Sequence, residues 1–256
     1  MSSYSKEVQS SLNLNDDEVY YGKEANWQYM SVSQYKEFVK CEAAALAKLK
    51  GDYEPLSNPK ALLVGNFVHS YFEGPEAHTS FIEQNKDEMY SKRKPHGLLK
   101  DFKVAQAMIE RVEREPFFNF LWQGEKEVVV TGELFGTEWK GKIDLLNIEE
   151  GYFVDLKTTR SINNRMWSTD YGQYVSFIEG YGYVTQLAIY EKLLEMEYGK
   201  PFEGFIYAVS KEEPPNVQAI EVDWHKKMFE YDLVEQRMED ILKVKHGEAE
   251  PEMCGS

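Results

Sequence analysis

Apolar side chains recur at three- and four-residue intervals in five stretches of the chain, which is the spacing of one buried helix face. Ser33 is a candidate cap for the first stretch, and Gly51 is a stop signal for it. Pro59 suits the first turn of the second stretch, which Gly74-Pro75 ends, and Asp223 is a candidate cap for the last. We therefore predict helices over residues 33–50, 59–73, 98–114, 181–198 and 224–245.

The pattern changes in the middle of the chain to alternating or continuous apolar runs, which are typical of strands. Three such runs follow one another closely and predict an antiparallel meander, and two more precede the last helix. The five predicted strands cover residues 127–131, 138–148, 152–157, 204–210 and 217–222. This order predicts an α+β fold of the α/β/α type, in which helices flank a central mixed, partly antiparallel sheet.

No break in composition divides the chain, and no period of 20 to 50 residues recurs. We therefore expect a polar lead-in over residues 1–30, a single domain over residues 31–246 and a disordered tail over residues 247–256.

The composition excludes several classes of protein. Lys and Arg total 29 against 44 Asp and Glu in 256 residues, which gives a net charge of −15 and argues against coating nucleic acid by bulk charge. Contact with DNA would need a local basic patch or a bound metal. No stretch approaches the ~20 apolar residues of a membrane span, and the first residues lack the features of a secretion signal. Cys41 and Cys254 are too few for a four-cysteine metal site, so we expect a reduced, cytoplasmic setting.

Two acids and a lysine interrupt otherwise apolar strands in the meander: Asp144, Asp155 and Lys157. Side chains alternate along a strand, so Asp155 and Lys157 share one face. A four-residue loop ending in Gly151 would place Asp144 opposite Asp155 on that face, whereas a three-residue loop would shift the register by one.

Like charges on directly opposite strands repel, and a divalent cation between Asp144 and Asp155 would remove the conflict. Mg²⁺ takes one or two carboxylates and leaves positions for water and phosphate. Lys157 could orient or deprotonate the attacking water, or stabilise charge on the phosphate. The simpler alternative is an Asp–Lys pair on a solvated sheet face. The flanking apolar residues favour the catalytic interpretation, because unpaired acids in a buried sheet are costly.

These residues resemble the PD-(D/E)XK nuclease signature of the RecB-like and lambda-exonuclease-like branch. Three further motifs of that branch occur in the same order, and the match spans roughly Ser31 to Ser210. They are the Ser-x-Ser segment from Met30 to Cys41, the Gly-x-x-x-His-x-x-x-Glu segment from Gly65 to Glu73, and the Gln-x-x-x-Tyr segment from Tyr183 to Tyr190. The likeness is greatest to phage RecE-type, exodeoxyribonuclease VIII-like proteins, and it implies a restriction-endonuclease-like core.

The resemblance also implies a ligand set. The metal would be Mg²⁺, with Mn²⁺ as a substitute, bound by Asp144, Asp155, the Leu156 backbone carbonyl and His69, with Glu73 as a further candidate. Without the resemblance, His69 on an apolar helix would be interpreted as a core residue. Cys41 stands where relatives with an iron–sulfur cluster have their first cysteine, but no partner triplet follows, so no cluster is expected.

Several residues are candidates for DNA contacts. The resemblance implies that Gln186, Tyr190 and Tyr183, on one helix face, contact the DNA backbone or the catalytic lysine. Thr158, Thr159 and Arg160 leave the sheet beside the expected metal, and Lys92, Arg93 and Lys94 form a basic loop. An aromatic group could stack on unpaired bases, form a lid or belong to the core: Trp167, Tyr171, Tyr174 and Phe177.

The resemblance therefore implies a Mg²⁺-dependent DNA exonuclease that acts on linear duplex DNA in phage-type recombination, beside a single-strand annealing protein. RecE-type and lambda-type relatives form rings around DNA, so a homo-oligomeric ring is a further expectation. Two alternatives remain open at this point. One is an end-processing nuclease subunit of a RecB-like or CRISPR-adaptation-like complex. The other is a non-catalytic acidic protein that mimics DNA.

Overall fold

The computed structural model of the protein describes residues 12–54, 59–94 and 96–253. Its centre is a five-stranded mixed sheet in the order β1-β2-β3-β6-β7, in which only the β3–β6 pair is parallel. The strands are β1 (Glu125–Leu134), β2 (Thr137–Asn147), β3 (Tyr152–Thr159), β6 (Glu203–Ser210) and β7 (Val217–Glu221). The predicted α+β class is confirmed, and the sheet contains all five predicted strands.

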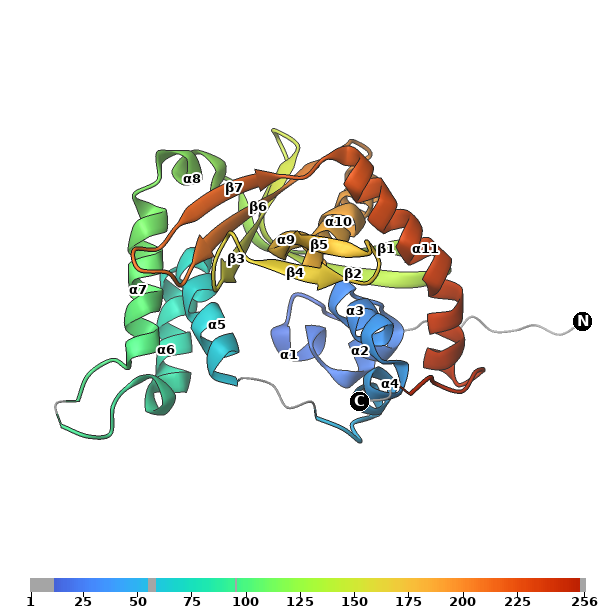
Figure 1. Cartoon of the computed structure of the whole chain (residues 1–256), viewed down its shortest axis with the longest axis horizontal. Helices are drawn as coiled ribbons and strands as arrows, with labels where there is room; N and C mark the ends of the chain where they lie inside the picture. Colours follow the sequence, from blue (N-terminus) through green and yellow to red (C-terminus); the bar gives the residue numbers. More distant parts are fainter. Residues whose placement is uncertain (1–11, 55–58, 95, 254–256) are drawn as a thin grey trace, which may run out of the picture.

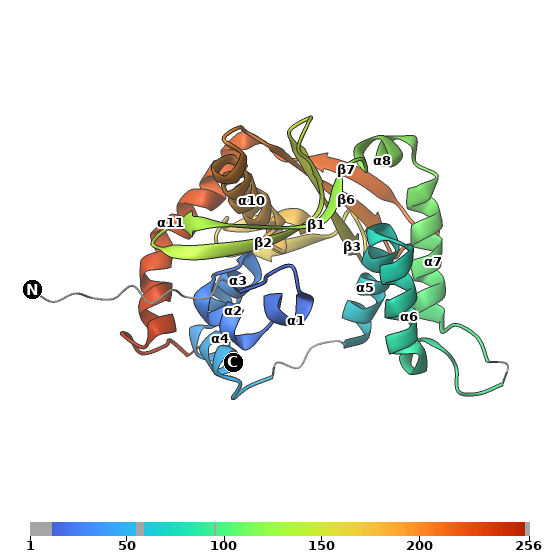
Figure 2. The same cartoon turned by 180° about the vertical axis from the view of Figure 1, so that it is seen from behind.

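Helices cover both faces of this sheet (Figures 1 and 2). One side carries α5 (Pro59–Glu73), α6 (Pro75–Met89), α7 (Lys100–Glu113) and α8 (Pro116–Leu121). The other side carries α3 (Val32–Lys40), α4 (Glu42–Lys50), α10 (Tyr183–Tyr198) and α11 (Trp224–His246). The remaining elements are α1 (Asp17–Tyr20), α2 (Lys23–Gln28), α9 (Phe177–Gly180) and the hairpin of β4 (Arg165–Ser168) with β5 (Gln173–Ser176).

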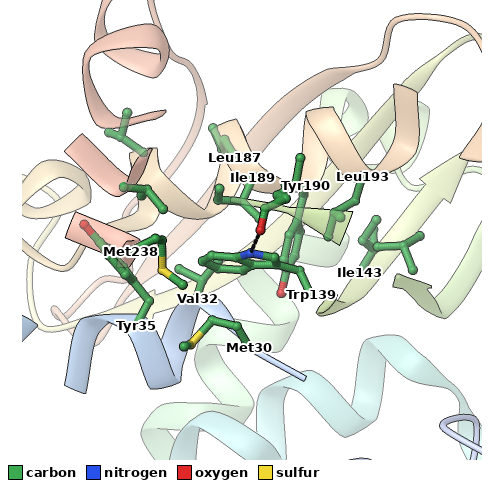
Figure 3. Close-up of a cluster of buried hydrophobic side chains, with 14 of the residues drawn as sticks. Met30, Val32, Tyr35, Trp139, Ile143, Leu187, Ile189, Tyr190, Leu193 and Met238 are labelled. Carbon is green, nitrogen blue, oxygen red and sulfur yellow. Dashed lines mark hydrogen bonds between the residues drawn. The ribbon is translucent and has the colours of Figure 1, made fainter. Parts of the chain in front are cut away.

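Each helical layer forms its own apolar core with the sheet. Trp139 of β2 lies in the core on the α10–α11 side, where its indole Nε1 donates a hydrogen bond to the Leu134 carbonyl oxygen at 3.0 Å (Figure 3). Phe102, Phe118 and Leu156 belong to the core on the α5–α8 side. Burial of such large side chains contributes about 1.5–3 kcal/mol each, so both layers hold the sheet firmly.

The helix predicted over residues 33–50 is wrong as a single helix. The chain forms two helices, separated by the extended backbone of Cys41 (φ −167°, ψ 106°). The cap is Ser31, not Ser33, and its Oγ accepts a hydrogen bond from Gln34 N at 3.2 Å. The apolar spacing does not reveal this break, because both helices bury side chains in the same core.

Residues 12–30, predicted as a polar lead-in, contain two short helices that pack on the sheet. Leu14, Tyr20 and Ala25 are buried there. The Lys140 ammonium of β2 donates to the Tyr20 carbonyl oxygen and, at 2.9 Å, to Asn26 Oδ1. In the predicted tail, Glu252 N donates to Glu42 Oε2 at 2.8 Å, while residues 1–11 and 254–256 lie outside the described residues. Over the ranges that the structure describes, no helix is both long and apolar enough to cross a bilayer.

Strands β2 and β3 pair over only three residue pairs, and this short pairing creates the site. A loop over residues 148–151 sets the predicted register, in which Asn147 faces Tyr152 and Leu145 faces Val154. The pairing stops there, just before Asp144 and Asp155. Beyond that point Met30 joins β2 instead, because its N–H donates to the Glu138 carbonyl and its carbonyl accepts from Lys140 N.

Candidate active site

Asp144 lies where the regular alternation of β2 fails. Leu145 faces the core of α5–α8, yet Ile143, two positions away, faces the core of α10–α11. The β1–β2 pairing passes over Asp144 and the facing Glu127, whose φ of 54° is left-handed. Such a conformation is costly for a residue with a side chain and is typical of functional sites. Because of this break, the Asp144 side chain does not follow the regular alternation of β2. Its Oδ2 accepts a hydrogen bond from Leu156 N at 2.7 Å.

Asp155 and Lys157 lie on the same face of β3, as predicted from their spacing. Lys157 Nζ lies 2.7 Å from Asp155 Oδ2, and Gln186 Nε2 donates to Asp155 Oδ1 at 2.7 Å. Asp155 is only 2% exposed. Among the buried side-chain polar atoms that the structure describes, its Oδ2 is the one without a hydrogen bond of acceptable geometry. Lys157 is the cationic partner of this buried oxygen, and the nearby Asp144 carboxylate adds a second negative charge that a divalent cation would balance.

His69 reaches the site from α5. A Cβ atom at Gly65, one turn earlier, would lie 3.4 Å from Thr158 Oγ1, so the helix approaches β3 closely at that turn. His69 Nδ1 lies 3.6 Å from Asp144 Oδ2, which is too long for a hydrogen bond, and the His69 side chain is 31% exposed. Burial and the Lys157 cation lower the pKa of His69 to about 4, so the imidazole is neutral at pH 7. The neutral ring is the form that ligates metals.

The charges of the cluster are strongly coupled. Burial and the neighbouring Asp155 raise the pKa of Asp144 well above its usual range. Burial opposes the charge of Lys157, but the Asp155 and Asp144 carboxylates outweigh it, and the pKa of Lys157 rises above its ordinary value. Lys157 is therefore a protonated donor at neutral pH.

The donor set suits a hard divalent cation. The described residues contain no group of three His, Cys, Asp or Glu side chains already arranged as metal ligands. Mg²⁺ nevertheless needs only one or two carboxylates, since water and substrate phosphate complete its coordination. The neighbouring carboxylates of Asp144 and Asp155 fit that requirement.

A family model assigns this fold: the PDDEXK-like domain of unknown function (DUF3799) matches residues 31–256. The chain belongs to this PDDEXK-like family. A crystal structure from Eubacterium rectale named "Putative exonuclease" is 37% identical, has a TM-score of 0.85, and aligns over 93% of this chain and 89% of that chain. The curated proteins contain no match. The predicted membership of the PD-(D/E)XK superfamily is thus confirmed, and PDDEXK nucleases generally use divalent metals.

Helix α10 supports the PDDEXK-like site with three residues. Gln186 binds the Asp155 carboxylate rather than the lysine. The Tyr183 ring instead receives Lys157, whose Nζ lies 4.8 Å from the ring centroid. Tyr190 is buried, and its hydroxyl accepts from Lys142 N at 3.4 Å. A Cβ atom at Gly141 would lie 2.5 Å from the Tyr190 ring, so the glycine of the Gly-Lys-Ile-Asp motif makes room for this tyrosine.

Other predicted residues lie outside this cluster. Glu73 is exposed and makes no hydrogen bond or ion pair within the described ranges. Thr159 is buried and donates from Oγ1 to the Ser161 carbonyl, whereas Arg160 is exposed. The predicted basic loop with Lys92, Arg93 and Lys94 connects α6 to α7 at the outer ends of these helices (Figure 1).

The four aromatic candidates have different positions. Phe177 is buried in the fold, and the Tyr171 hydroxyl donates to Glu230 Oε1 at 2.8 Å. Trp167 and Tyr174 face each other across the β4–β5 hairpin and are 59% and 62% exposed. This pair is therefore the most exposed of the four.

Two charged residues near the site have no signal in the sequence. Glu127 faces Asp144, and its Oε2 pairs with Lys142 Nζ at 2.9 Å. Lys36 of α3 lies near the same Tyr183 ring as Lys157, with its Nζ 5.5 Å from the ring centroid. Each adjoins other charged residues in the sequence, and only the fold reveals what it faces.

Proposed function

We propose that this chain is a metal-dependent deoxyribonuclease that hydrolyses phosphodiester bonds from the ends of linear DNA. The observation that carries the proposal is the buried carboxylate of Asp155, whose Oδ2 pairs with the protonated Lys157 close to Asp144, at the point where β2 and β3 separate. The family membership and the name of the Eubacterium rectale structure support nuclease chemistry.

Asp144, Asp155, the Leu156 carbonyl and His69 would hold the cation. When bound, a divalent cation supplies Lewis-acid polarisation of the scissile phosphate. Lys157 carries a proton at neutral pH, which favours orienting the attacking water and stabilising charge on the phosphate over general-base catalysis. Gln186 fixes the Asp155 carboxylate through Oδ1, while Oδ2 pairs with Lys157. The expected order of metals is Mg²⁺ or Mn²⁺ active and Ca²⁺ nearly inactive, because Ca²⁺ polarises water more weakly.

The finer assignment follows the likeness to RecE-type proteins. We propose linear duplex DNA as the substrate and a role in phage-type recombination, where the exposed single strand would pass to an annealing protein. An exonuclease requires an end, so a closed circular duplex should resist degradation.

The test compares Asp155→Asn and Lys157→Met with the wild type on linear DNA labelled at either end, with Mg²⁺, Ca²⁺ or a chelator. Each variant should lose roughly 10³-fold or more in rate, equivalent to about 4 kcal/mol of transition-state stabilisation. The amide of Asp155→Asn still offers Gln186 an oxygen, so folding should persist. Lys192→Met is the matched control, because Lys192 pairs with Glu195 at the surface of α10. Near wild-type rates in either site variant, or cleavage in chelator, would contradict the proposal.

A further inference from the structure

Lys36 of α3 is held in one position by contacts along its whole side chain. Its Nζ donates to the Tyr181 carbonyl oxygen at 3.0 Å. Its alkyl chain lies against Gly182, where a Cβ atom would come within 2.7 Å of Lys36 Cδ. Gly182 also has a left-handed φ of 67°. A fixed lysine loses little conformational entropy on binding a ligand, which distinguishes Lys36 from a mobile surface lysine.

This fixed cation has no anionic partner of its own. No ion pair joins Lys36 to an acid in the part of the chain that the structure describes. The nearest acids are occupied, since Glu37 pairs with Lys48 and Asp155 pairs with Lys157. The ammonium groups of Lys36 and Lys157 both lie near the Tyr183 ring, at 5.5 Å and 4.8 Å from its centroid. Burial, followed by the Lys157 charge, lowers the pKa of Lys36 to about 8, which is the cost of placing a second cation here.

Lys36 also lines a cavity of about 1070 Å³ between α3, the β4–β5 hairpin and α11. Six acids line the cavity, and three of them, Asp170, Glu179 and Asp240, take part in ion pairs. Asp170 binds Arg237, Glu179 binds Lys226, and Glu230 accepts hydrogen bonds from Tyr171 and Thr185. Trp167 lines the same cavity from the hairpin. Lys36 thus lies near Lys157 and also lines a space whose wall carries three ion-paired acids and the exposed Trp167 ring.

We propose that Lys36 binds a backbone phosphate of the DNA strand, adjacent to the phosphate that Lys157 faces, and so directs that strand into the cavity beside the β4–β5 hairpin. This inference rests on the proposed nuclease function and adds a strand-binding position to it. An anion there would relieve the repulsion between Lys36 and Lys157, and a polyanionic chain supplies successive phosphates to both lysines.

The test measures binding of a short single-stranded DNA oligonucleotide over a range of salt concentrations, in the Asp155→Asn background so that no cleavage occurs. Each phosphate neutralised on a single strand contributes about 0.7 to the slope of log affinity against log salt. Lys36→Met should weaken binding several-fold and reduce the slope by about 0.7. Lys36→Arg should retain both values, and Lys192→Met, which removes an equal charge elsewhere, should leave both unchanged.

An unchanged salt slope in a folded Lys36→Met protein would overturn the inference. Lys36→Gln takes its place, with the same readout, if Lys36→Met does not fold. The outcome is separable from the nuclease proposal. If the wild type cleaves linear DNA while the slope is unchanged, Lys36 is structural and the nuclease stands. If the slope falls but the wild type does not cleave, the phosphate position stands and the nuclease proposal fails.

Discussion

His69 is the catalytic candidate whose role is least fixed by the sequence, and the structure provides a matched control for it. His69→Ala should raise the Mg²⁺ concentration needed for half-maximal cleavage by about 10- to 100-fold, because a ligand of the cation is lost. His78 of α6 lies outside the site and contacts Ser70 Oγ through Nδ1 at 2.9 Å. His78→Ala should lower stability without changing the metal requirement. A Mg²⁺ titration of cleavage by both variants measures this requirement. If the two midpoints are equal, His69 is not a ligand of the cation.

At the scale of single residues, spacing alone predicts much of the site. The i, i+2 relation of Asp155 and Lys157 holds on any strand, so their shared face could be predicted. Asp144 was expected opposite Asp155, and the register is as predicted, but the pairing ends one position earlier and Asp144 turns to Leu156 N. Lys36 could not be predicted, because its hydrogen-bond partner lies 145 positions further along the chain.

The β4–β5 hairpin is an element with two distinct faces. Met166 and Val175 form its inner pair, and a Cβ atom at Gly180 would lie 2.3 Å from Met166 Cγ, so the hairpin packs tightly on α9. Trp167 and Tyr174 form the outer pair and bury little surface within the chain. The element is therefore anchored on one side and presents aromatic rings on the other, as base-stacking surfaces do.

Trp167→Ser and Tyr174→Ser should leave the free energy of unfolding within about 0.5 kcal/mol of the wild type. Each should weaken single-stranded DNA binding by about 1–3 kcal/mol if its ring stacks on a base. Phe120→Ser is the control, because Phe120 is 70% exposed on α8, on the other side of the sheet. Fluorescence titration with an oligonucleotide measures the effect, and wild-type affinity in both hairpin variants would exclude stacking.

Helices α1 and α2 are attached to the sheet through a buried lysine, which makes stability depend on pH. Lys140 is 2% exposed, and burial lowers its pKa from 10.5 to about 8. Above pH 8 the folded chain releases a proton that the unfolded chain retains up to about 10.5, so the free energy of unfolding should rise with pH in this window. The contribution of Lys140 is at most about 1.4 kcal/mol per pH unit.

Urea unfolding at pH 7.5, 8.5 and 9.5 measures this rise, below the range where the tyrosines of the unfolded chain ionise. Lys140→Met should reduce the slope of unfolding free energy against pH. Part of the slope should remain, because burial also lowers the pKa of Lys245 to about 8. Lys192→Met should keep the wild-type slope, since the ion pair with Glu195 raises the pKa of Lys192 instead. An equal slope in Lys140→Met and wild type would contradict the assignment.

The elements missed by the sequence prediction share a physical cause. Helix α6 has Pro75 at its first turn but few apolar residues, and only Met89 is buried in it. Helix α8 and strands β4 and β5 are six residues long or shorter, too short for a period to be recognised. The long elements of the sheet and its two helical layers have strong apolar periods, which is why the fold class could be predicted.

The charge of the whole molecule bears on how it would retain DNA. With a net charge of −15, a monomer should hold duplex DNA weakly and lose it steeply with salt. We predict a closed homo-oligomer that encloses the DNA, so that several basic positions face one channel. Light scattering should give a multiple of the 29.8 kDa chain mass, and linear DNA should be degraded much faster than closed circles. A monomer that nicks closed circles as fast as it shortens linear DNA would contradict both the ring and the end dependence.

The contact of Met30 with β2 has a practical consequence for where the domain can be cut. The family match begins at residue 31, so a chain shortened to this boundary would lose Met30 and with it the hydrogen bonds to Glu138 and Lys140. Those backbone groups lie on the edge of β2 that β3 does not cover. Without Met30 they would form an unpaired strand edge beside the buried Trp139. Unpaired strand edges form hydrogen bonds with strands of other molecules. The shortened protein should therefore aggregate more readily than the full chain.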